Sequence, residues 1–423
     1  MWWKKDPEAL VVGAGPVGLA VASRMARRGL QVRILDKQWG PAGHSYALAL
    51  HAATVEALGE MGLEEELLRR AHPISELCVF EKEQMVARVD LPSPLLVLPQ
   101  RALEEILEED LRRHGIEVAW NRRVSRVALP DDRPLVTVER LEKDSMGYPI
   151  ATTGWVVHSV GRLRPRFVVG ADGSGSVVRR DAKISLDVAG DLETFAVFEL
   201  AASGVNERQA VIAFHGETVN VLWPMGDGRF RWSFQLLPPD PSLLPRVKAR
   251  RTTGEDRHEV PLSEATFRKL VRHRAPWFSE DLGEIFWSTA VSFEQHVARR
   301  FGQGPLWLAG DAAHGASPVG SHSMNGGIRE GLELADLLAR VALGDASPEV
   351  LETWNRERCL EWRQLLGMDG SGRLLPSAGA WLEACAPALP GLVPASGRDL
   401  ESLLGRLGLE WHTQRPALQE VLP

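Results

Sequence analysis

Three short motifs rich in glycine and aspartate occur in a fixed order along this chain of 423 residues. They begin at Gly13, Gly170 and Gly310, and each directly follows a short run of mostly apolar residues. Such runs are typical of buried parallel strands, whose carboxyl ends lie together at one edge of a sheet. The three motifs, although far apart in the sequence, are therefore predicted to meet at one ligand-binding site.

The first motif, Gly13-Ala14-Gly15-Pro16-Val17-Gly18, stands between a strand expected at residues 9–12 and a helix. In such a unit the first glycine permits a tight turn, and the second lets a pyrophosphate approach the backbone. The third lets the helix pack closely on the strand. Pro16 suits the first turn of a helix, whose N-terminal amides favour negative charge. A second strand, at 31–35, leads to Asp36, where an acid commonly binds a ribose hydroxyl. The unit predicts a dinucleotide site but does not distinguish NAD from FAD.

The two later motifs carry a more specific signal. Gly170-Ala171-Asp172-Gly173 continues to Arg179, and Gly310-Asp311-Ala312-Ala313-His314 precedes a long helix expected to include Leu338. With these motifs in this order, the chain resembles the group A flavoprotein monooxygenases, the para-hydroxybenzoate hydroxylase-like family. The resemblance covers about residues 8–345 and includes the spacing between the motifs.

This resemblance implies noncovalent FAD as the cofactor and NAD(P)H as a transient co-substrate. It implies that Asp36 binds the adenosine ribose and that Asp311 binds the ribityl hydroxyls. The backbone amides at the start of the long helix would face the flavin edge, because a helix N-terminus stabilises the negative charge of reduced flavin. Nicotinamide is expected to enter a groove near Asp172 and Arg179. The residues expected to bind the cofactors are Gly13, Gly15, Pro16, Val17, Gly18, Asp36, Lys37, His44, Gln100, Val124, Asp172, Gly173, Arg179, Gly310, Asp311, Pro318, Gly320, Met324 and Asn325.

The sequence departs from the family pattern at two places. Ser323 stands where the family commonly has glycine, and Glu330-Gly331 replaces the usual Asp-Ala. We expect flavin binding to survive these changes and the cavity in which oxygen reacts to change shape.

Four residues are candidates for catalysis: Pro318, His322, His215 and His51. Pro318 is implied by the resemblance, over the reactive face of the flavin. A phenol hydroxylase uses a base, because an ionised ring donates electrons to an electrophilic oxygen, and histidine titrates near neutral pH. Each histidine is alternatively a structural residue, and the sequence leaves both interpretations open.

The predicted fold is α/β, with a Rossmann-type FAD-binding domain interrupted by a mixed or antiparallel-sheet substrate domain. The FAD-binding domain is expected at 1–75, 95–183 and 300–345, and the substrate domain at 76–94 and 184–299, where apolar and polar residues alternate. A C-terminal helical segment is expected at 346–423. Four aromatic residues of the substrate domain either line a pocket or belong to its core: Phe214, Trp223, Trp232 and Phe234.

Composition excludes several other classes of protein. Apolar residues make up 44% of the chain, enough for a globular core. The net charge is −7 without a long basic block, so no nucleic-acid partner is expected. No apolar run is long enough to span a membrane, and the first residues lack the apolar core of a secretion signal. The three cysteines are far apart and lack metal-ligand spacing, which predicts no metal site and favours the cytoplasm.

The function implied is that of an FAD-dependent NAD(P)H monooxygenase, active as a monomer or homodimer. It would use O2 to hydroxylate or epoxidise an aromatic or heteroaromatic small molecule through a flavin C4a-hydroperoxide. An oxygen-independent flavoprotein reductase and a flavin-dependent halogenase are alternatives, although the halogenase segment Trp-x-Trp-x-Ile-Pro does not occur here. A non-catalytic binder of the GDP-dissociation-inhibitor type is a distant alternative, against which the complete motifs argue.

Overall fold

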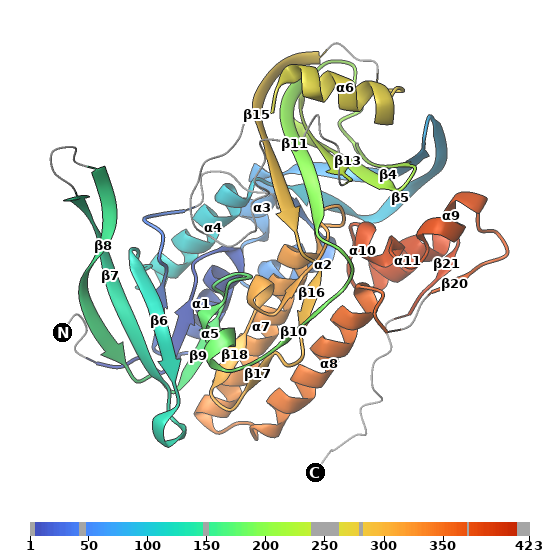
Figure 1. Ribbon diagram of the computed structural model, residues 1–423. Helices are drawn as coiled ribbons and strands as arrows, with labels where there is room; N and C mark the ends of the chain where they lie inside the picture. The colour runs from blue at the N-terminus through green and yellow to red at the C-terminus, as the bar shows by residue number, and fades with distance from the viewer. Residues whose placement is uncertain are drawn as a thin grey trace.

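A computed structural model of the protein describes residues 5–41, 48–146, 152–237, 262–278, 282–369 and 372–412. Its two main sheets lie one above the other in Figure 1, with a small three-stranded sheet at one side and the C-terminal helices at the other. This arrangement confirms the predicted α/β class with a helical C-terminal segment.

The sheet that carries the three motifs has five strands in the order β17-β18-β9-β1-β2. Four of them are parallel, and β17 runs antiparallel to β18. Gly170 pairs with Val12 on one side and with Leu308 on the other, so all three motifs leave the sheet at the same edge. The strands are β1 (Ala9–Val12), β2 (Val32–Leu35), β9 (Phe167–Gly170), β17 (Gly302–Gln303) and β18 (Leu306–Leu308).

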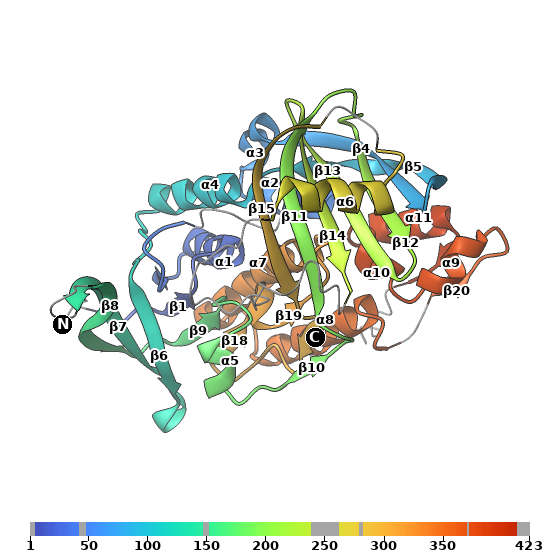
Figure 2. The same ribbon diagram turned by 45° about the horizontal axis from the view of Figure 1, so that its top comes forward.

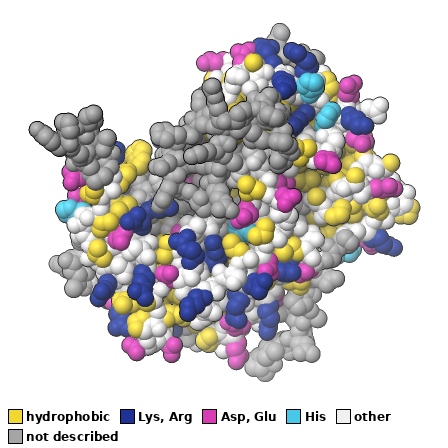
Figure 3. All heavy atoms as spheres, viewed as in Figure 1, with side chains coloured by type: hydrophobic (Ala, Val, Ile, Leu, Met, Phe, Trp, Pro, Cys, Tyr) yellow, Lys and Arg dark blue, Asp and Glu magenta, His cyan; other side chains and the backbone are white. Residues whose placement is uncertain are grey.

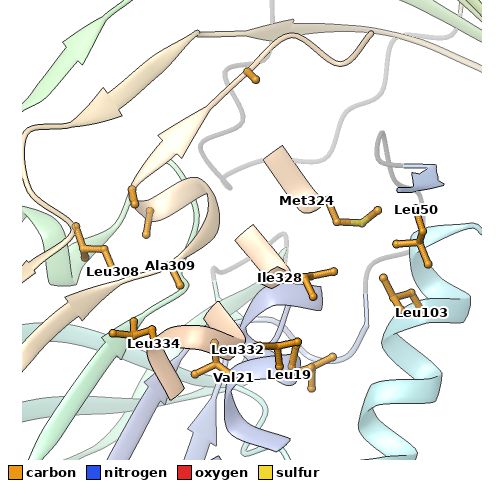
Figure 4. Packing of buried hydrophobic residues seen from close by; sticks show 14 of the residues in the cluster. Leu19, Val21, Leu50, Leu103, Leu308, Ala309, Met324, Ile328, Leu332 and Leu334 are labelled. Atoms are coloured by element: carbon orange, nitrogen blue, oxygen red, sulfur yellow. The ribbon is translucent and has the colours of Figure 1, made fainter. Parts of the chain in front are cut away.

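Two helices cross closely beneath the predicted site. Helix α1 (Pro16–Arg27) follows the first motif, and α7 (His322–Leu343) follows the third. A β-carbon on Gly327 would lie 2.8 Å from Val17, and one on Gly331 would lie 2.7 Å from Val21. Figure 4 shows the apolar side chains of both helices gathered in this region of the core. The glycine at position 331, one of the departures from the family pattern, therefore permits the close approach of the two helices.

The larger sheet has eight strands in the order β15-β11-β14-β13-β12-β4-β5-β3. Only β12 and β4 pair in parallel, so the sheet is mixed, as predicted. The strands are β3 (Ala49–Leu50), β4 (His72–Glu81), β5 (Gln84–Val97), β11 (Glu193–Ala202), β12 (Gln209–His215), β13 (Thr218–Gly226), β14 (Arg229–Leu236) and β15 (Leu282–Phe293).

One face of this sheet is covered by helix α6 (Glu264–Arg274), which crosses in front of β11 and β14 in Figure 2. Phe267 of α6 packs against Phe198 and Phe234, with ring centroids 5.0 and 6.2 Å away. Trp232 stacks on Phe234 in the same apolar cluster. Two of the four aromatic residues in question, Trp232 and Phe234, are therefore core residues on the face turned away from the motifs.

The remaining elements surround these two sheets. The three-stranded sheet consists of β6 (Arg122–Ala128), β7 (Leu135–Met146) and β8 (Thr152–Leu163). A second small sheet joins β10 (Leu186–Val188), β16 (His296–Ala298) and β19 (His314–Gly315). The other N-terminal helices are α2 (Ala52–Gly59), α3 (Glu64–Arg70), α4 (Gln100–Arg113) and α5 (Val177–Asp181), with 3-10 turns η1 (Pro130–Asp132) and η2 (Gly310–Ala312).

The C-terminal segment is hydrogen-bonded to α7 through Glu330. Trp362 Nε1 donates a hydrogen bond of 2.9 Å to Glu330 Oε2, while Glu330 Oε1 is paired with His314 Nε2. The His314 ring stacks on Trp362, with centroids 3.5 Å apart. Glu330, which belongs to the same departure from the family pattern as Gly331, thus links the third motif to the C-terminal segment. That segment contains α8 (Glu349–Leu365), α9 (Ala380–Cys385), α10 (Leu389–Leu392), α11 (Arg398–Leu407) and the short hairpin of β20 (Arg373–Leu374) and β21 (Leu409–Glu410).

Across the described ranges, no helix combines the length and apolar character that a bilayer-spanning segment has. Nor does this part of the chain contain a group of three or more side chains placed to hold a metal ion. On the face shown in Figure 3, basic and acidic side chains are interspersed.

Candidate cofactor and substrate site

Two cavities lie on either side of the edge where the motifs meet. The α7 cavity, about 340 Å³, extends toward the start of α7, and the β2 cavity, about 880 Å³, extends toward the end of β2. Ala171 and Gly173 line both of them. Among the residues predicted to bind cofactors, the α7 cavity is lined by Gly15, Pro16, Val17, Gly18, Gln100, Gly173, Asp311, Pro318 and Met324. The β2 cavity is lined by Gly13, Asp36, Lys37, Val124, Asp172 and Gly173.

The three glycines of the first motif have different surroundings. Gly13 has a φ of +105°, and a β-carbon there would overlap the Ala171 carbonyl oxygen. A β-carbon on Gly18 would overlap the Gly13 carbonyl oxygen. Gly15 has an ordinary φ of −73°, and a β-carbon there would meet no atom of the described residues beyond its chain neighbours within 4 Å. The outer glycines therefore hold the turn together, whereas Gly15 leaves open space in the α7 cavity at the start of α1.

Asp36 holds the turn as well as lining the β2 cavity. Its Oδ2 accepts a hydrogen bond of 2.8 Å from the Ala14 amide, and its Oδ1 accepts one of 2.7 Å from the Gln38 amide. Both bonds fix the carboxylate at the end of β2, facing the β2 cavity.

Asp172 and Asp311 each present a carboxylate to one of the cavities. Asp172 Oδ2 accepts a hydrogen bond of 2.7 Å from the Val177 amide, while Oδ1 is buried and has no partner among the described residues. Asp311 has no hydrogen-bond partner in the same ranges, and its exposed surface faces the α7 cavity. Desolvation by the surrounding protein raises the pKa of both carboxyls. Two carboxylates without full protein partners suit a ligand rich in hydroxyl groups.

The start of α7 faces the α7 cavity. Ser321 precedes the helix with a φ of +55° and gives no side-chain cap to its first amides. Met324 lines the cavity, and the Ser323 hydroxyl accepts a hydrogen bond of 2.9 Å from the Ala316 amide. Ser323, which stands where the family commonly has glycine, therefore stabilises the loop before α7 through this hydrogen bond. The N-terminus of α7 stays available to a negatively charged group.

Asn325 is a positioning residue. Its Oδ1 accepts a hydrogen bond of 2.8 Å from the His51 amide, and its Nδ2 donates to the carbonyls of Ala49 and Ser321, each at 2.8 Å. These bonds tie α7 to β3 and α2. Its side chain is therefore satisfied by the protein, and only its backbone amide is left for the predicted contact with the flavin.

His51 and His322 line neither the α7 cavity nor the β2 cavity, contrary to their prediction as catalytic residues. His51 Nε2 lies 2.9 Å from the Gly320 carbonyl, and its Nδ1 lies 2.6 Å from Ser396 Oγ. His322 Nε2 lies 3.0 Å from the Val393 carbonyl, and the two rings meet edge to face at 5.2 Å. Burial lowers the pKa of His322 to about 4 and that of His51 well below its usual value. Both are neutral structural residues between α7 and the C-terminal segment.

Gly320 and Gly310, which were predicted to bind the cofactor, are not among the residues that line the α7 and β2 cavities. A β-carbon on Gly320 would overlap the Gly391 carbonyl, so this glycine permits contact with α10. Gly310 has a φ of +60°, and a β-carbon there would lie 2.9 Å from Val17. Each glycine shapes the loop around the cavity instead of facing it. His44, the other predicted contact, lies outside the described residues.

His215 ends β12, and its side chain does not line the neighbouring cavity although Phe214 and Gly216 do. Successive residues of a strand point to opposite faces, which explains the difference. Its Nδ1 is buried without a partner in the described ranges, and desolvation lowers its pKa. The structure therefore does not support the predicted role of His215 as a base.

Arg179 was predicted to border the groove for nicotinamide, but its side chain is buried under the loop of the third motif. Its Nη1 donates a hydrogen bond of 2.9 Å to the Ala312 carbonyl, and its Nη2 donates one of 2.6 Å to the Ser174 carbonyl. These two bonds join the second and third motifs. Arg179 is therefore a positioning residue beneath the α7 cavity.

We expect Arg179→Ala to destabilise the apoprotein by about 1–3 kcal/mol, because two carbonyls lose a charged partner. Urea denaturation of the apoprotein measures this change. Arg180→Ala, at the exposed neighbouring arginine, should stay within about 0.5 kcal/mol of the parent. If Arg179→Ala instead raised the KM for NAD(P)H without loss of stability, the result would support the predicted contact of Arg179 with nicotinamide.

Sequence reasoning missed His296, which lines the α7 cavity. It lies on β16, opposite Gly315 of the third motif's strand β19. Its Nδ1 is 3.0 Å from the Glu294 carbonyl, and its Nε2 is buried without a partner in the described part of the chain. Burial lowers its pKa, so the ring is neutral. Only the pairing of β16 with β19 reveals this residue, and no local sequence motif marks it.

A third cavity, the sheet cavity, has a volume of about 1060 Å³. It lies between strands β12 and β13 and the C-terminal helices α8, α9 and α10. Phe214 and Trp381 form part of its wall, with ring centroids 6.0 Å apart. Ser317 lines both this cavity and the α7 cavity. The arrangement thus provides a large chamber that adjoins the cofactor site.

These features fit FAD. The start of α1 beside Gly15 has no side-chain cap and suits a pyrophosphate. The carboxylates of Asp36 and Asp311 suit the ribose and ribityl hydroxyls, respectively. The start of α7 also has no side-chain cap and suits an anionic ring edge. The side-chain oxygen of Asp172 and the ring nitrogen of His296 that lack partners lie beside the same two cavities.

Comparison with known proteins agrees with this fit. A family model described as FAD binding domain matches residues 6–367. The chain is 32% identical to 6-methylpretetramide 4-monooxygenase of Streptomyces rimosus over 365 residues, which cover 83% of this chain and 59% of that protein. It is 27% identical to para-nitrophenol 4-monooxygenase of Pseudomonas sp. (strain WBC-3) over 372 residues, 82% of each chain. The chain thus spans about three fifths of the first of these relatives.

A solved structure shows the same fold. The crystal structure of p-nitrophenol 4-monooxygenase from Pseudomonas putida DLL-E4 has a TM-score of 0.71 and 20% sequence identity, covering 96% of this chain and 99% of that one. The motifs, their convergence at one sheet edge and the family match over most of the chain agree. The chain therefore belongs to the FAD binding domain family, with the group A, para-hydroxybenzoate hydroxylase-like flavoproteins that its motifs resemble.

Proposed function

We propose that this protein is an FAD-dependent monooxygenase that hydroxylates or epoxidises an aromatic or heteroaromatic small molecule with NAD(P)H and O2. The observation that carries the proposal is the sharing of Ser317 between the α7 cavity and the sheet cavity. A substrate in the sheet cavity would lie next to the cofactor in the α7 cavity. When bound, FAD supplies the redox chemistry, accepting a hydride from NAD(P)H and activating O2.

The residues of the two smaller cavities would hold FAD in an extended form. Asp36 and the backbone at Val124 would bind the adenosine end in the β2 cavity. The amides at the start of α1, next to Gly15, would bind the pyrophosphate. Asp311 would bind the ribityl hydroxyls. The first amides of α7 would stabilise negative charge on the flavin edge, and Pro318 would border its reactive face.

The sheet cavity supports a substrate larger than a single ring. Its volume of about 1060 Å³ is at the upper end of the range for small-molecule sites. Relatives named for the monooxygenation of 6-methylpretetramide and of para-nitrophenol favour an aromatic compound.

The use of oxygen separates this proposal from the reductase alternative. Purified protein reconstituted with FAD should oxidise NAD(P)H in air when an accepted phenol is added, and should stop after one reduction of its flavin without oxygen. Continued NAD(P)H oxidation without oxygen would instead favour a reductase. Retention of FAD by the purified protein would argue against the non-catalytic binder, and chloride-dependent products would favour the halogenase.

We expect the flavin to be bound without a covalent link. No cysteine lines the α7 cavity within the described residues, and the one histidine among its lining residues, His296, is buried in a hydrogen-bonded strand. Acid precipitation should therefore release all of the yellow colour into the supernatant. Colour left in the pellet would contradict this expectation, and mass spectrometry of peptides containing His296 would then test for attachment.

The domain division is also proposed on this basis, with FAD-binding parts at 1–75, 95–183 and 300–345, and substrate parts at 76–94 and 184–299. The structure adds that the limits near 76 and 94 fall inside β4 and β5. Three cysteines without disulfides support a cytoplasmic location. A monomer or homodimer remains the proposed state.

A further inference from the structure

We propose that Glu193 is the base that accepts the hydroxyl proton of a phenolic substrate in the sheet cavity. This inference rests on the proposed monooxygenase function and assigns its substrate class. Glu193 begins strand β11 and lines the sheet cavity. Ser317 borders both this cavity and the α7 cavity. Its side chain is close enough to Glu193 to favour the ionised form of the Glu193 carboxyl. The carboxylate is thus placed where the substrate chamber adjoins the cofactor site.

The Glu193 carboxylate is held in one orientation by the sheet. Its Oε1 accepts a hydrogen bond of 3.1 Å from Gln235 Nε2, and Gln235 Oε1 accepts one of 2.8 Å from the Val219 amide. The three residues lie on neighbouring strands β11, β14 and β13. A base fixed in this way loses little freedom when it binds a substrate hydroxyl.

The second oxygen of the carboxylate is left for a ligand. Glu193 Oε2 is buried and makes no hydrogen bond of normal geometry with any described residue, and the same holds for Ser317 Oγ. The side chains of Ser317 and Gln295 favour the ionised carboxyl, but desolvation outweighs them and raises the pKa of Glu193. A buried acceptor with a raised pKa is a stronger base than a carboxylate in water.

Other charged groups around the cavity do not explain this shift. Glu81, Lys82 and Glu217 lie at the ends of β4 and β12, Arg363 lies on α8, and Cys385 ends α9. None of them contributes a charge interaction to the pKa of Glu193, which is governed by desolvation and by neutral side chains. The raised pKa of Glu193 therefore comes from its burial and not from a neighbouring charge.

As one oxygen atom derived from O2 forms a bond to a ring carbon ortho or para to the substrate hydroxyl, its bond to the other oxygen atom breaks, and so does the phenolic O–H bond. The phenolic proton moves to Glu193 Oε2, and the ring oxygen becomes a carbonyl. The hydrogen on the newly substituted ring carbon leaves as a proton and is taken up by the departing oxygen atom. The proton on Glu193 Oε2 returns to the carbonyl oxygen, which restores the aromatic ring. NAD(P)H supplies the two electrons that reduce the other oxygen atom to water.

The test uses 4-nitrophenol with the FAD-loaded protein in the absence of NAD(P)H, so that no turnover occurs. The absorption of this probe distinguishes its neutral and ionised forms, and a pH series of difference spectra gives the pKa of the bound probe. In the parent protein this pKa should lie above that of the free probe, because the Glu193 carboxylate accepts the neutral O–H and repels the phenolate. Glu193→Gln should lower the preference for the neutral form at least about tenfold, which is one pKa unit.

Glu217→Gln is the matched control, because Glu217 lines the same cavity from an exposed turn. This variant should keep the preference for the neutral probe within about twofold, as expected for a surface change. In turnover, Glu193→Gln should lower kcat by about a hundredfold or more while leaving FAD affinity unchanged.

Two results would overturn the assignment of Glu193: an unchanged probe pKa in Glu193→Gln, or no binding of 4-nitrophenol to the parent protein. Neither bears on the proposed function, which is tested separately by flavin content and by oxygen-dependent NAD(P)H oxidation. Retention of FAD by Glu193→Gln checks that this variant is folded, so a lost pKa shift cannot be mistaken for unfolding.

Discussion

Replacement of Gly15 by alanine is expected to lower the affinity for FAD by about ten- to a hundredfold while leaving the apoprotein folded. The added methyl group would meet none of the described residues beyond its chain neighbours within 4 Å, and the φ of −73° suits alanine. It would project into the space at the start of α1 that we assign to the pyrophosphate. Insertion of a methyl group into a filled site costs about 1–3 kcal/mol, which corresponds to this loss of affinity.

Gly18→Ala is the contrasting variant. Its β-carbon would overlap the Gly13 carbonyl oxygen, so the turn itself must shift. This variant should unfold at lower urea concentration even without FAD, whereas Gly15→Ala should match the parent apoprotein. Fluorescence titration with FAD and urea denaturation of the apoproteins give both quantities. Normal FAD affinity in Gly15→Ala would show that the first motif does not contact the cofactor.

Asp311→Asn is expected to weaken FAD binding by about ten- to a hundredfold and, at neutral pH, to stabilise the apoprotein. A hydrogen bond to a charged group is worth about 1.5–3 kcal/mol, and the amide would replace a charged acceptor of the ribityl hydroxyls. Asp227→Asn, in an exposed turn away from the cavities, should leave both properties unchanged.

The gain in apoprotein stability should depend on pH in a defined direction. Desolvation by the surrounding protein raises the pKa of Asp311 in the folded protein, so the carboxylate destabilises the fold above that pKa. Solvent in the open α7 cavity screens part of this effect, because the side chain is exposed there. As pH falls through the folded value, the parent takes up a proton and this cost disappears. The advantage of Asp311→Asn should therefore be largest at neutral pH and vanish below about pH 3.9, the ordinary pKa of aspartate. An advantage that grows on acidification would contradict the raised pKa of this carboxyl.

The cofactor motifs could be predicted from the sequence because each is a local pattern. The strand before Gly13, the proline that starts α1 and the acid at Asp36 are all close in sequence, and their positions in the structure agree with the prediction. The parallel pairing of Gly170 with Val12 and Leu308 then follows from the general behaviour of buried parallel strands.

The roles of the histidines could not be predicted, because local sequence patterns do not show contacts between distant parts of the chain. His51 and His322 are satisfied by Ser396 and Val393 in the C-terminal segment, far away in the sequence, and no spacing rule marks such contacts. The guanidinium of Arg179 was misassigned for the same reason, because its partner Ala312 belongs to another motif.

Glu193 was not identified from the sequence, because its position beside the sheet cavity depends on the register of strand pairing. Glu193 is one of many acids in the chain, and only its contact with Gln235 on a neighbouring strand and its exposure to the sheet cavity distinguish it. Strand order in a mixed sheet is set by long-range pairing, to which a single sequence gives little access.

The fate of molecular oxygen tests the proposed monooxygenase activity most directly. The FAD-loaded protein would be supplied with NAD(P)H, isotopically labelled O2 and a phenol that stimulates NAD(P)H oxidation, and the product would be examined by mass spectrometry. The proposal predicts one labelled oxygen atom in each product molecule and no sustained NAD(P)H oxidation once oxygen is removed. A product without the label, or NAD(P)H oxidation that continues in the absence of oxygen, would contradict it.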